Sequence, residues 1–378
     1  MIERPDSGDA AVLVALDFGK PGFTESLEEL KELASSAGVA VFATVTGRRA
    51  SPDSATYAGS GKLDEVTAML DGTGASLVIF NHELSAAQQR NLENRLKCRV
   101  IDRTSLILDI FSQRAKSFEG KLQVELAQLE HLSTRLIRGW THLERQKGGI
   151  GLRGPGETQL ETDRRLIGKR VKLLKERLKK LKRQREVQRR SRARGHVPSI
   201  SIVGYTNAGK STLFNALTRA DSYAADQLFA TLDTTSRRMF VPGYGQAVLS
   251  DTVGFIRQLP HTLVASFCAT LEETIHADLL LHVVDSSNPV RDEQILEVNR
   301  VLAEIGAESV PQVLIFNKID INGQSAGMDR DEYGKIARIG LSARTGEGMG
   351  LVRELLGEFL GDGPVSPQQA EMLVAASF

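Results

Sequence analysis

The chain has 378 residues, which is enough for two or three domains with sizeable cores. Hydrophobic residues make up 41% and charged residues 25%, as in an ordinary globular protein, and no run of 18 apolar residues is available to span a membrane. The two cysteines, Cys98 and Cys268, exclude a disulfide framework, and the first residues lack the basic start of a signal peptide, so we expect a cytoplasmic protein.

Residues 11–115 alternate between strand-like and helix-like stretches. Short apolar, β-branched runs predict strands at 12–16, 39–45, 77–80 and 99–101. Amphipathic stretches predict helices at 25–36, 63–70, 85–96 and 105–114. This alternation is typical of a parallel α/β fold, so we predict a small parallel α/β subdomain over residues 1–115.

A glycine-rich stretch at residues 57–62 resembles a phosphate-binding loop. However, Thr56 stands where the first glycine would be, and Leu63 replaces the hydroxyl that would bind Mg²⁺. We interpret the stretch as a turn before a helix, with a second nucleotide site as the alternative.

Residues 116–195 follow a heptad-like rhythm. Seam positions recur every three or four residues, first at Leu122, Leu126, Leu129, Ser133, Leu136, Trp140 and Leu143, and again at Ile167, Val171, Leu174, Leu178 and Leu181. Two long helices with such seams are predicted to pack as an antiparallel hairpin. Residues 148–156 contain five glycines and one proline, so we predict a non-helical, glycine-rich tip there.

Charge is unevenly distributed along this hairpin. Residues 164–194 contain 16 Lys or Arg and two acids, a net charge of +14, which leaves −13 for the rest because the whole chain carries +1. A solvated helix face is the ordinary interpretation of a basic run, but charge of one sign at this density favours a polyanionic partner. We predict that this partner is the RNA backbone. The alternative partner is the phosphate of a membrane surface, in which case the protein would be transiently membrane-associated.

The glycine-rich tip has two interpretations as well. It is either a flexible connection or a place where backbone closely approaches an RNA surface, and we prefer the second. The candidate RNA-binding residues of the hairpin are Lys147, Arg153, Lys179, Lys180, Lys182 and Arg183.

A phosphate-binding loop follows a β-branched run at residues 199–203 and precedes a predicted helix. It reads Gly204-Tyr205-Thr206-Asn207-Ala208-Gly209-Lys210-Ser211-Thr212. Backbone N–H groups freed by the glycines can wrap a β-phosphate, helped by the helix N-terminus. Lys210 can place its charge toward the β- and γ-phosphates, and the Ser211 hydroxyl is a hard ligand suited to Mg²⁺.

Three more motifs follow, each after an apolar run that predicts a strand. Asp251-Thr252-Val253-Gly254 offers a carboxylate to the Mg²⁺ shell, through water, and a glycine N–H to a γ-phosphate. Asn317-Lys318-Ile319-Asp320 offers Asp320 to the N1–H and N2–H₂ groups of guanine, which adenine lacks. Ser342-Ala343-Arg344 can offer a backbone N–H to guanine O6. Together these motifs indicate a guanine-nucleotide site.

Residues 228–235 predict a switch segment that includes Phe229 and Ala230. We expect Thr231 to bind Mg²⁺ when a γ-phosphate is present, with Thr235 as the competitor. Phe255 stands where many small GTPases have a water-orienting glutamine, so intrinsic hydrolysis should be slow. Asn207 resembles the asparagine that holds K⁺ in potassium-stimulated GTPases, and we expect it to bind K⁺.

These features predict an α/β P-loop GTPase domain with a mostly parallel sheet over residues 196–361, followed by a tail over residues 362–378. The catalytic residues are expected to be Lys210, Thr231 and Gly254, and the cofactor Mg²⁺, with K⁺ as a second candidate ion.

Several stretches of the chain resemble HflX, a family of ribosome-associated GTPases in the translation-factor-related Obg/HflX group. The resemblance covers nearly the whole chain and is carried by residues 57–66, 100–104, 148–165, 228–233 and 251–261. It implies a factor that hydrolyses GTP to GDP and phosphate, binds the large (50S) ribosomal subunit and splits stalled or idle 70S ribosomes, notably after heat stress. It also implies that the hairpin reaches toward the peptidyl-transferase centre and that ribosome contact raises hydrolysis.

The sequence departs from this family at two places. Thr234 stands where relatives usually have proline, and some relatives carry a further small carboxy-terminal domain, for which a chain ending at Phe378 is too short. The family's suspected use of ATP in the amino-terminal domain finds no motif here.

We predict a monomeric GTPase that splits or recycles ribosomes. A tRNA- or rRNA-modification factor would need a catalytic constellation outside the nucleotide domain, and the sequence contains neither a metal cluster nor a nucleophile–base pair there. The alternatives that stay open are a regulatory GTP-dependent RNA-binding switch and a ribosome-assembly factor, each with little turnover.

Overall fold

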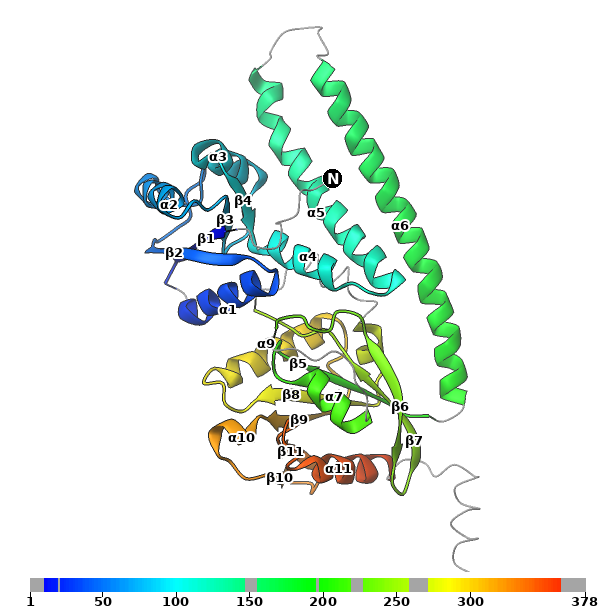
Figure 1. The fold of residues 1–378 in the computed structure, drawn as a ribbon. Coiled ribbons are helices and arrows are strands. Elements are labelled where there is room, and N and C mark those ends of the chain that lie inside the picture. The colour runs from blue at the N-terminus through cyan, green and yellow to red at the C-terminus, as the bar shows by residue number, and fades with distance from the viewer. Residues whose placement is uncertain are drawn as a thin grey trace, which may run out of the picture. The chain divides into compact units, whose positions relative to one another are not determined.

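The structure is a computed structural model that describes residues 10–19, 21–146, 155–194, 197–218, 227–257 and 271–361 (Figure 1). The chain divides into two compact units, Met1–Lys179 and Lys180–Phe378, which are described separately. In the described ranges, no helix is both long and apolar enough to cross a membrane.

The first unit contains a four-stranded parallel sheet in the order β2-β1-β3-β4. Its strands are β1 (Ala10–Asp17), β2 (Ala40–Arg48), β3 (Leu77–Phe80) and β4 (Arg99–Asp102). The helices between and after them are α1 (Phe23–Ser36), α2 (Ser60–Thr73), α3 (Ala86–Leu96) and α4 (Arg103–Arg114). The predicted parallel α/β fold is therefore confirmed, and each predicted element lies within three residues of an observed one.

Local sequence explains where these helices begin. Ser85 accepts a hydrogen bond from the Gln88 N–H, and the Gln88 side chain accepts one from the Ser85 N–H, which is a capping box. Asp102 similarly accepts from the Ser105 N–H at the start of α4. Helices α2 and α3 bury apolar side chains against one face of the sheet, in a core that includes Val12, Leu63 and Leu92.

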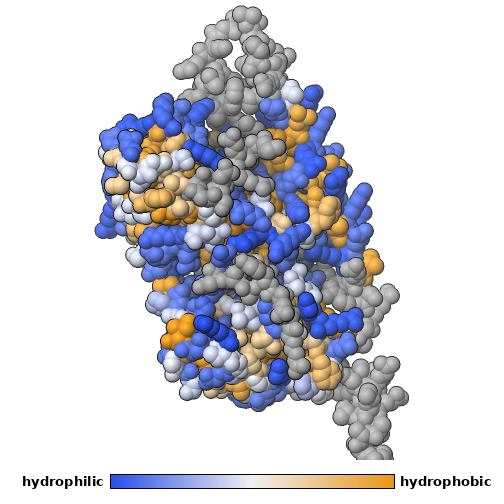
Figure 2. Space-filling model, in the orientation of Figure 1, coloured by the Kyte–Doolittle hydropathy of each residue, from blue (hydrophilic) through white to orange (hydrophobic). Residues whose placement is uncertain are grey.

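The helical hairpin consists of α5 (Phe118–Gln146) and α6 (Pro155–Arg194), which run antiparallel side by side (Figure 1). Three of the predicted seam residues are buried, Leu122 and Leu126 of α5 and Leu174 of α6. The side chains of Leu136, Trp140 and Leu143 lie outside the described ones. Ion pairs of 2.6 Å between Arg170 and Glu125 and 2.8 Å between Lys175 and Glu130 join the helices across the seam. The visible surface of α6 is mostly hydrophilic with scattered apolar residues (Figure 2). Leu166, Leu173 and Val187 of this helix are exposed.

The prediction that residues 148–156 are non-helical is wrong at its end, because α6 begins at Pro155. Proline suits the first position of a helix, since its missing N–H would have no partner there and its φ is already helical. The remainder of the predicted tip, with Lys147 and Arg153, lies outside the described residues.

The second unit contains a seven-stranded sheet in the order β10-β11-β9-β8-β5-β7-β6. The five central strands are parallel, whereas β6 and β10 are antiparallel to their neighbours. The strands are β5 (Ser199–Gly204), β6 (Thr235–Val241), β7 (Gly245–Asp251), β8 (Leu279–Asp285), β9 (Gln312–Asn317), β10 (Gly327–Arg330) and β11 (Ile336–Gly340). The helices are α7 (Lys210–Thr218), α9 (Arg291–Glu304), α10 (Ile319–Asn322) and α11 (Met349–Gly361). This confirms the mostly parallel sheet of the predicted GTPase domain.

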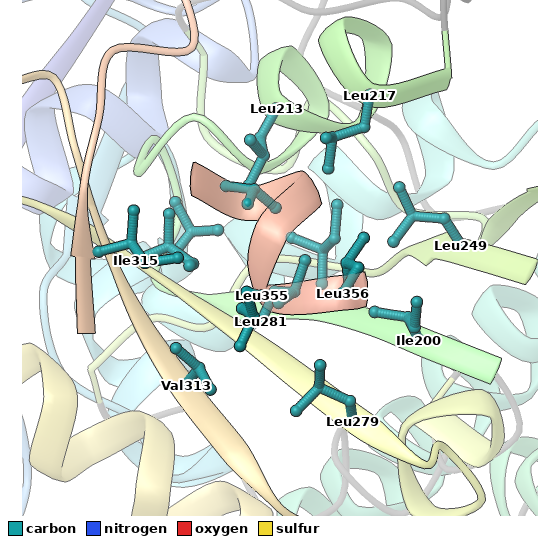
Figure 3. Close-up of a cluster of buried hydrophobic side chains, with 14 of the residues drawn as sticks. Ile200, Leu213, Leu217, Leu249, Leu279, Leu281, Val313, Ile315, Leu355 and Leu356 are labelled. Atoms are coloured by element: carbon teal, nitrogen blue, oxygen red, sulfur yellow. The ribbon is translucent and has the colours of Figure 1, made fainter. Parts of the chain in front are cut away.

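One core of this unit lies between the sheet and two helices (Figure 3). Strand residues such as Ile200, Leu281 and Ile315 meet Leu213 of α7 and Leu356 of α11 there. The central strands are apolar on both faces because helices cover both sides of a parallel sheet. Their carboxyl ends share one edge, and the loops that follow them are consequently brought together.

His282 of β8 makes the stability of the second unit dependent on pH, and it lies on the face of the sheet opposite this core, to which Leu281 and Val283 belong. Its side chain is only 1% exposed, and burial lowers its pKa from 6.5 to about 4. Between these pH values the unfolded chain binds a proton at His282 that the folded chain does not bind. The contribution of His282 to the free energy of unfolding is therefore present above pH 6.5 and is lost as the pH falls toward 4. We expect the free energy of unfolding of the second unit to fall by about 1.5 kcal/mol between pH 6.5 and pH 5. Urea unfolding curves recorded at the two pH values measure this change.

The control is His282→Leu, which removes the titrating ring and keeps an apolar side chain. Its stability should change less than that of the native chain across the same window. Parallel pH profiles for the two proteins would contradict the assignment of this acid sensitivity to His282.

Candidate functional site

A cavity of about 460 Å³ lies where the loops after β5, β7, β9 and β11 meet. Most of the predicted nucleotide-site residues line it: Thr206, Asn207, Gly209, Lys210, Ser211, Thr212, Phe229, Ala230, Thr231, Thr252, Gly254, Asn317, Lys318, Asp320, Ser342 and Arg344. Of the remaining predicted residues, Gly204, Tyr205, Ala208, Asp251, Val253 and Ala343 do not line it. Gln227 and Ile321 also line the cavity, and sequence reasoning missed both.

Two glycines make the loop after β5 possible. Gly204 has φ +146° and Gly209 has φ +93°, angles that side-chain-bearing residues rarely adopt. A Cβ on Gly204 would lie 2.2 Å from the Val283 carbonyl oxygen, and one on Gly209 would lie 2.2 Å from Asn317 Nδ2. The loop therefore packs directly on β8 and on the end of β9, and its backbone N–H groups keep their curved arrangement.

Lys210 is buried at the start of α7. Its Nζ donates a hydrogen bond of 2.7 Å to the Tyr205 carbonyl oxygen within the same loop. Burial lowers the pKa of Lys210 to about 8, although the nearby Asp251 carboxylate acts in the opposite direction. A desolvated ammonium of this kind gains most from an anionic ligand placed against it.

Three oxygen-bearing side chains from separate segments converge beside Lys210. Ser211 Oγ donates to Asp251 Oδ2 over 2.7 Å, Thr231 Oγ1 donates to the same oxygen over 3.1 Å, and the two hydroxyls lie 2.7 Å apart. We call these three residues the oxygen cluster. Burial raises the pKa of Asp251, whereas the hydrogen bond from Ser211 and the charge of Lys210 lower it.

The oxygen cluster fits a divalent cation. Two hydroxyl oxygens and one carboxylate are the hard ligands that Mg²⁺ prefers, and a cation would compensate the desolvation of Asp251. The sequence-based competitor does not share this position: Thr235 begins β6 opposite Asp251 in the backbone ladder and does not line the cavity.

Asn317 forms hydrogen bonds to two of the other motifs. Its Nδ2 donates to the Ala208 carbonyl oxygen and its Oδ1 accepts from the Ala343 N–H, both over 2.9 Å. The predicted phosphate-binding loop at residues 204–212 and the loop that follows β11 are consequently held at the end of β9. Asp320 lies at the cavity wall on α10, where its carboxylate can accept hydrogen bonds from a ligand.

Lys318 shows a contact that the sequence analysis did not anticipate. Its Nζ donates to Asp285 Oδ2 over 2.7 Å, and Asp285 Oδ1 accepts from the N–H and hydroxyl of Ser287. Lys318 also has φ +67°, an unusual angle for a residue with a side chain. The signal was available, because Asp285 ends an apolar strand just as Asp251 does.

Phe255 is fully buried and contributes no polar group to the cavity. Its backbone pairs with the phosphate-type loop, donating to the Gly204 oxygen over 3.2 Å and accepting from the Thr206 N–H over 2.7 Å. A Cβ on the preceding Gly254 would lie 2.9 Å from the Thr206 Cα and 2.9 Å from Lys210 Nζ. The backbone of Thr206 cannot move aside as a flexible side chain can, so only glycine allows this close approach.

The predicted RNA-binding residues of α6 are in different environments. Lys179, Lys180 and Arg183 are exposed. Lys182 is exposed as well, but it forms an ion pair of 2.6 Å with the buried Glu272, so part of its charge is already neutralised.

A strand, a glycine-rich loop and a helix around a cavity, on a mostly parallel sheet, are the architecture of a P-loop GTPase domain. Family descriptions match along the chain: "GTP-binding GTPase N-terminal" at residues 24–112, "GTP-binding GTPase Middle Region" at 114–192 and "50S ribosome-binding GTPase" at 199–318. The GTPase HflX of Escherichia coli K12 is 56% identical over 95% of this chain and 85% of its own length. The chain belongs to the HflX family of GTPases, which implies GTP binding and hydrolysis.

Two further comparisons agree. The GTPase HflX of Caldanaerobacter subterraneus subsp. tengcongensis is 49% identical over 88% of this chain and 78% of its own length. A crystal structure of SsGBP in complex with GDP is similar with a TM-score of 0.52 and 26% identity, covering 93% of this chain and 98% of that chain.

The contact between Asp285 and Lys318 leads to a prediction. Asp285→Asn keeps the shape of the side chain and removes its charge, so Lys318 loses its ionic partner beside the base end of the cavity. We expect GDP to bind about tenfold more weakly, as is typical for loss of one charge-assisted hydrogen bond. Asp292→Asn on α9, where the aspartate side chain is 88% exposed, is the matched control and should bind GDP normally. Equal dissociation constants for both variants in a fluorescent-GDP titration would refute a role for Asp285.

Proposed function

We propose that this protein is a GTP-hydrolysing factor that binds the large ribosomal subunit and splits stalled or idle 70S ribosomes. Membership of the HflX family and the "50S ribosome-binding GTPase" description over residues 199–318 support the ribosomal partner. The proposal that GTP controls this activity is supported by the oxygen cluster. Its hydrogen bonds connect the start of α7, the predicted switch segment and the end of β7.

In this proposal the site residues have distinct roles. The backbone of residues 204–209 holds the β-phosphate, Lys210 stabilises charge on the β- and γ-phosphates, and the Gly254 N–H contacts the γ-phosphate. Ser211 and Thr231 would hold Mg²⁺ directly and Asp251 through water, and the ion would neutralise developing phosphate charge. Asp320 reads guanine, while Asn317 and Lys318 hold the base-binding loops together.

Hydrolysis by the isolated protein is expected to be slow. Phe255 cannot orient a water molecule, and its burial leaves the place after Gly254 without a polar side chain. We propose that ribosome contact completes the site and raises turnover, so that the activity is confined to ribosome-bound protein. A cytoplasmic monomer acting after heat stress fits this role.

A second proposal concerns Asn207 in the phosphate loop. It lines the cavity and has φ +62°, an unusual angle for a residue with a side chain. We propose that Asn207 binds K⁺, which would add positive charge near the transferred phosphoryl group. Turnover should then be several-fold faster in KCl than in NaCl, and Asn207→Ala should abolish the difference. Equal turnover in the two salts by the native protein would rule out this role.

One observation favours the alternative of a GTP-dependent RNA-binding switch with negligible turnover, namely the missing polar group at Phe255. Measuring GTP hydrolysis with and without purified 50S subunits separates the two functions. We expect at least tenfold stimulation by 50S subunits, and a flat response would favour the switch.

Splitting is tested by sedimentation. Native protein with a non-hydrolysable GTP analogue should convert 70S particles into 30S and 50S subunits, because formation of the γ-phosphate contacts closes the switch before any hydrolysis. Lys210→Ala, which removes the phosphate contact, should leave the 70S peak unchanged. An unchanged 70S peak with the native protein would contradict ribosome splitting.

A further inference from the structure

A basic cleft lies along the edge of the second unit's sheet. It has a volume of about 380 Å³ and is lined by Arg185, Thr234, Ser236, Arg237, Arg238, Val248 and Glu273. Three guanidinium groups and one carboxylate give it a net positive charge. The cleft is separate from the nucleotide cavity, since the two share no lining residue.

Strand β6 supplies most of this lining because it is the last strand of the sheet as described and pairs only with β7. Arg238 lies opposite Val248, and successive residues on a strand point to opposite faces, so Arg237 lies on the other face. Both long side chains reach the cleft at this edge. Phe240 follows Arg238 on the same face and is 71% exposed.

The two arginines of β6 differ from several arginines of the second unit that have carboxylate partners. Three such pairs are Arg257 with Glu293, Arg330 with Glu358, and Arg338 with Asp329. Among the residues that the structure describes, no acidic side chain forms an ion pair with Arg237 or Arg238. Two guanidinium groups without a carboxylate partner raise the positive potential of the cleft, and a bound anion would compensate it.

The side chains around the cleft match the chemistry of RNA. Guanidinium groups bind phosphate oxygens through paired hydrogen bonds, and an exposed aromatic ring two residues along the strand offers a face on which a base can stack. The exposed Lys180 and Arg183 lie on the same helix as Arg185 and extend the positive surface. The carboxylates of an acidic peptide could also pair with the arginines. Such a peptide would not account for the exposed ring of Phe240, whereas an RNA base can stack on it.

We propose that this cleft binds an unpaired stretch of RNA, with Arg237 and Arg238 on its phosphates and Phe240 against a base. The inference rests on the proposed ribosomal function, because it identifies ribosomal RNA as the ligand of this surface.

The position of the cleft also suggests a route to the nucleotide site. Thr234 lines the cleft, β6 begins at Thr235, and Thr231 of the oxygen cluster is only three residues before Thr234. RNA bound to β6 restricts this short segment and so favours the position in which Thr231 contacts Asp251. Contact with RNA would thereby raise GTP hydrolysis without any residue of the cleft reaching the phosphates.

Charge reversal tests the RNA contact. The double variant Arg237→Glu/Arg238→Glu is compared with Arg300→Glu/Arg353→Glu, which makes the same charge change at exposed sites on α9 and α11. We expect the first variant to bind 50S subunits at least about tenfold more weakly in 0.1 M salt, with a salt dependence shallower by about 1.4 units of slope for the two lost phosphate contacts. GDP affinity should be native in both variants, which shows that the domain is folded.

The outcomes separate this inference from the function on which it rests. If the native protein does not bind 50S subunits, the ribosomal function itself fails. If the native protein binds and both double variants bind equally well, the ribosomal function stands and the RNA cleft is refuted.

A photocrosslink tests the chemical class of the partner without altering any arginine. With p-azidophenylalanine in place of Phe240, irradiation in the presence of 50S subunits should attach the protein to 23S rRNA. Attachment to a ribosomal protein, or no attachment by a variant that still binds 50S subunits and GDP, would overturn the proposal.

Discussion

The convergence of Ser211, Thr231 and Asp251 on one point is the interaction on which the rest of the second unit depends. The three side chains come from the start of α7, the segment before β6 and the end of β7, and their oxygens lie within 2.7–3.1 Å of one another. A buried carboxylate is unfavourable by itself, so the hydroxyls and the nearby ammonium of Lys210 are needed to stabilise it. A cation with a phosphate ligand would stabilise it further, and this links the position of the switch to the nucleotide.

The parallel sheet makes this convergence possible. Strands β5 and β7 are hydrogen-bonded neighbours, so the loops that follow them emerge side by side at the same edge. The close packing there leaves no room for side chains at Gly209 and Gly254, whose Cβ atoms would collide with Asn317 and Lys210. Rigid strands and missing side chains together hold the polar groups at a fixed spacing, which electrostatic stabilisation of phosphate charge requires.

Much of the fold and of the site could be predicted from sequence, because the decisive signals are local. The phosphate loop, the carboxylates at strand ends and the alternation of strands and helices are all contiguous patterns, and the structure brings Thr231 rather than Thr235 to the cluster as expected. The start of α6 was misjudged because glycine content suggested a break, whereas Pro155 is compatible with a first helical turn.

Contacts between distant segments were harder to predict. The ion pair of Lys318 with Asp285 depends on β8 lying beside β9, and that of Lys182 with Glu272 depends on how the last part of α6 packs within the second unit. The cleft at β6 was missed for the same reason, since Arg185 and Arg238 are far apart in sequence. Residue type alone could not show which basic side chains are already paired and which remain available to a ligand.

Magnesium titration of the nucleotide complexes tests the central claim most directly. In the native protein, Mg²⁺ should strengthen binding of a non-hydrolysable GTP analogue far more than binding of GDP, because Thr231 joins the ion only beside a γ-phosphate. Thr231→Val keeps the shape of the side chain and removes the hydroxyl, and it should eliminate most of that difference while leaving GDP affinity unchanged. If the variant retains the full magnesium-dependent preference for the analogue, the oxygen cluster does not connect the switch to the nucleotide.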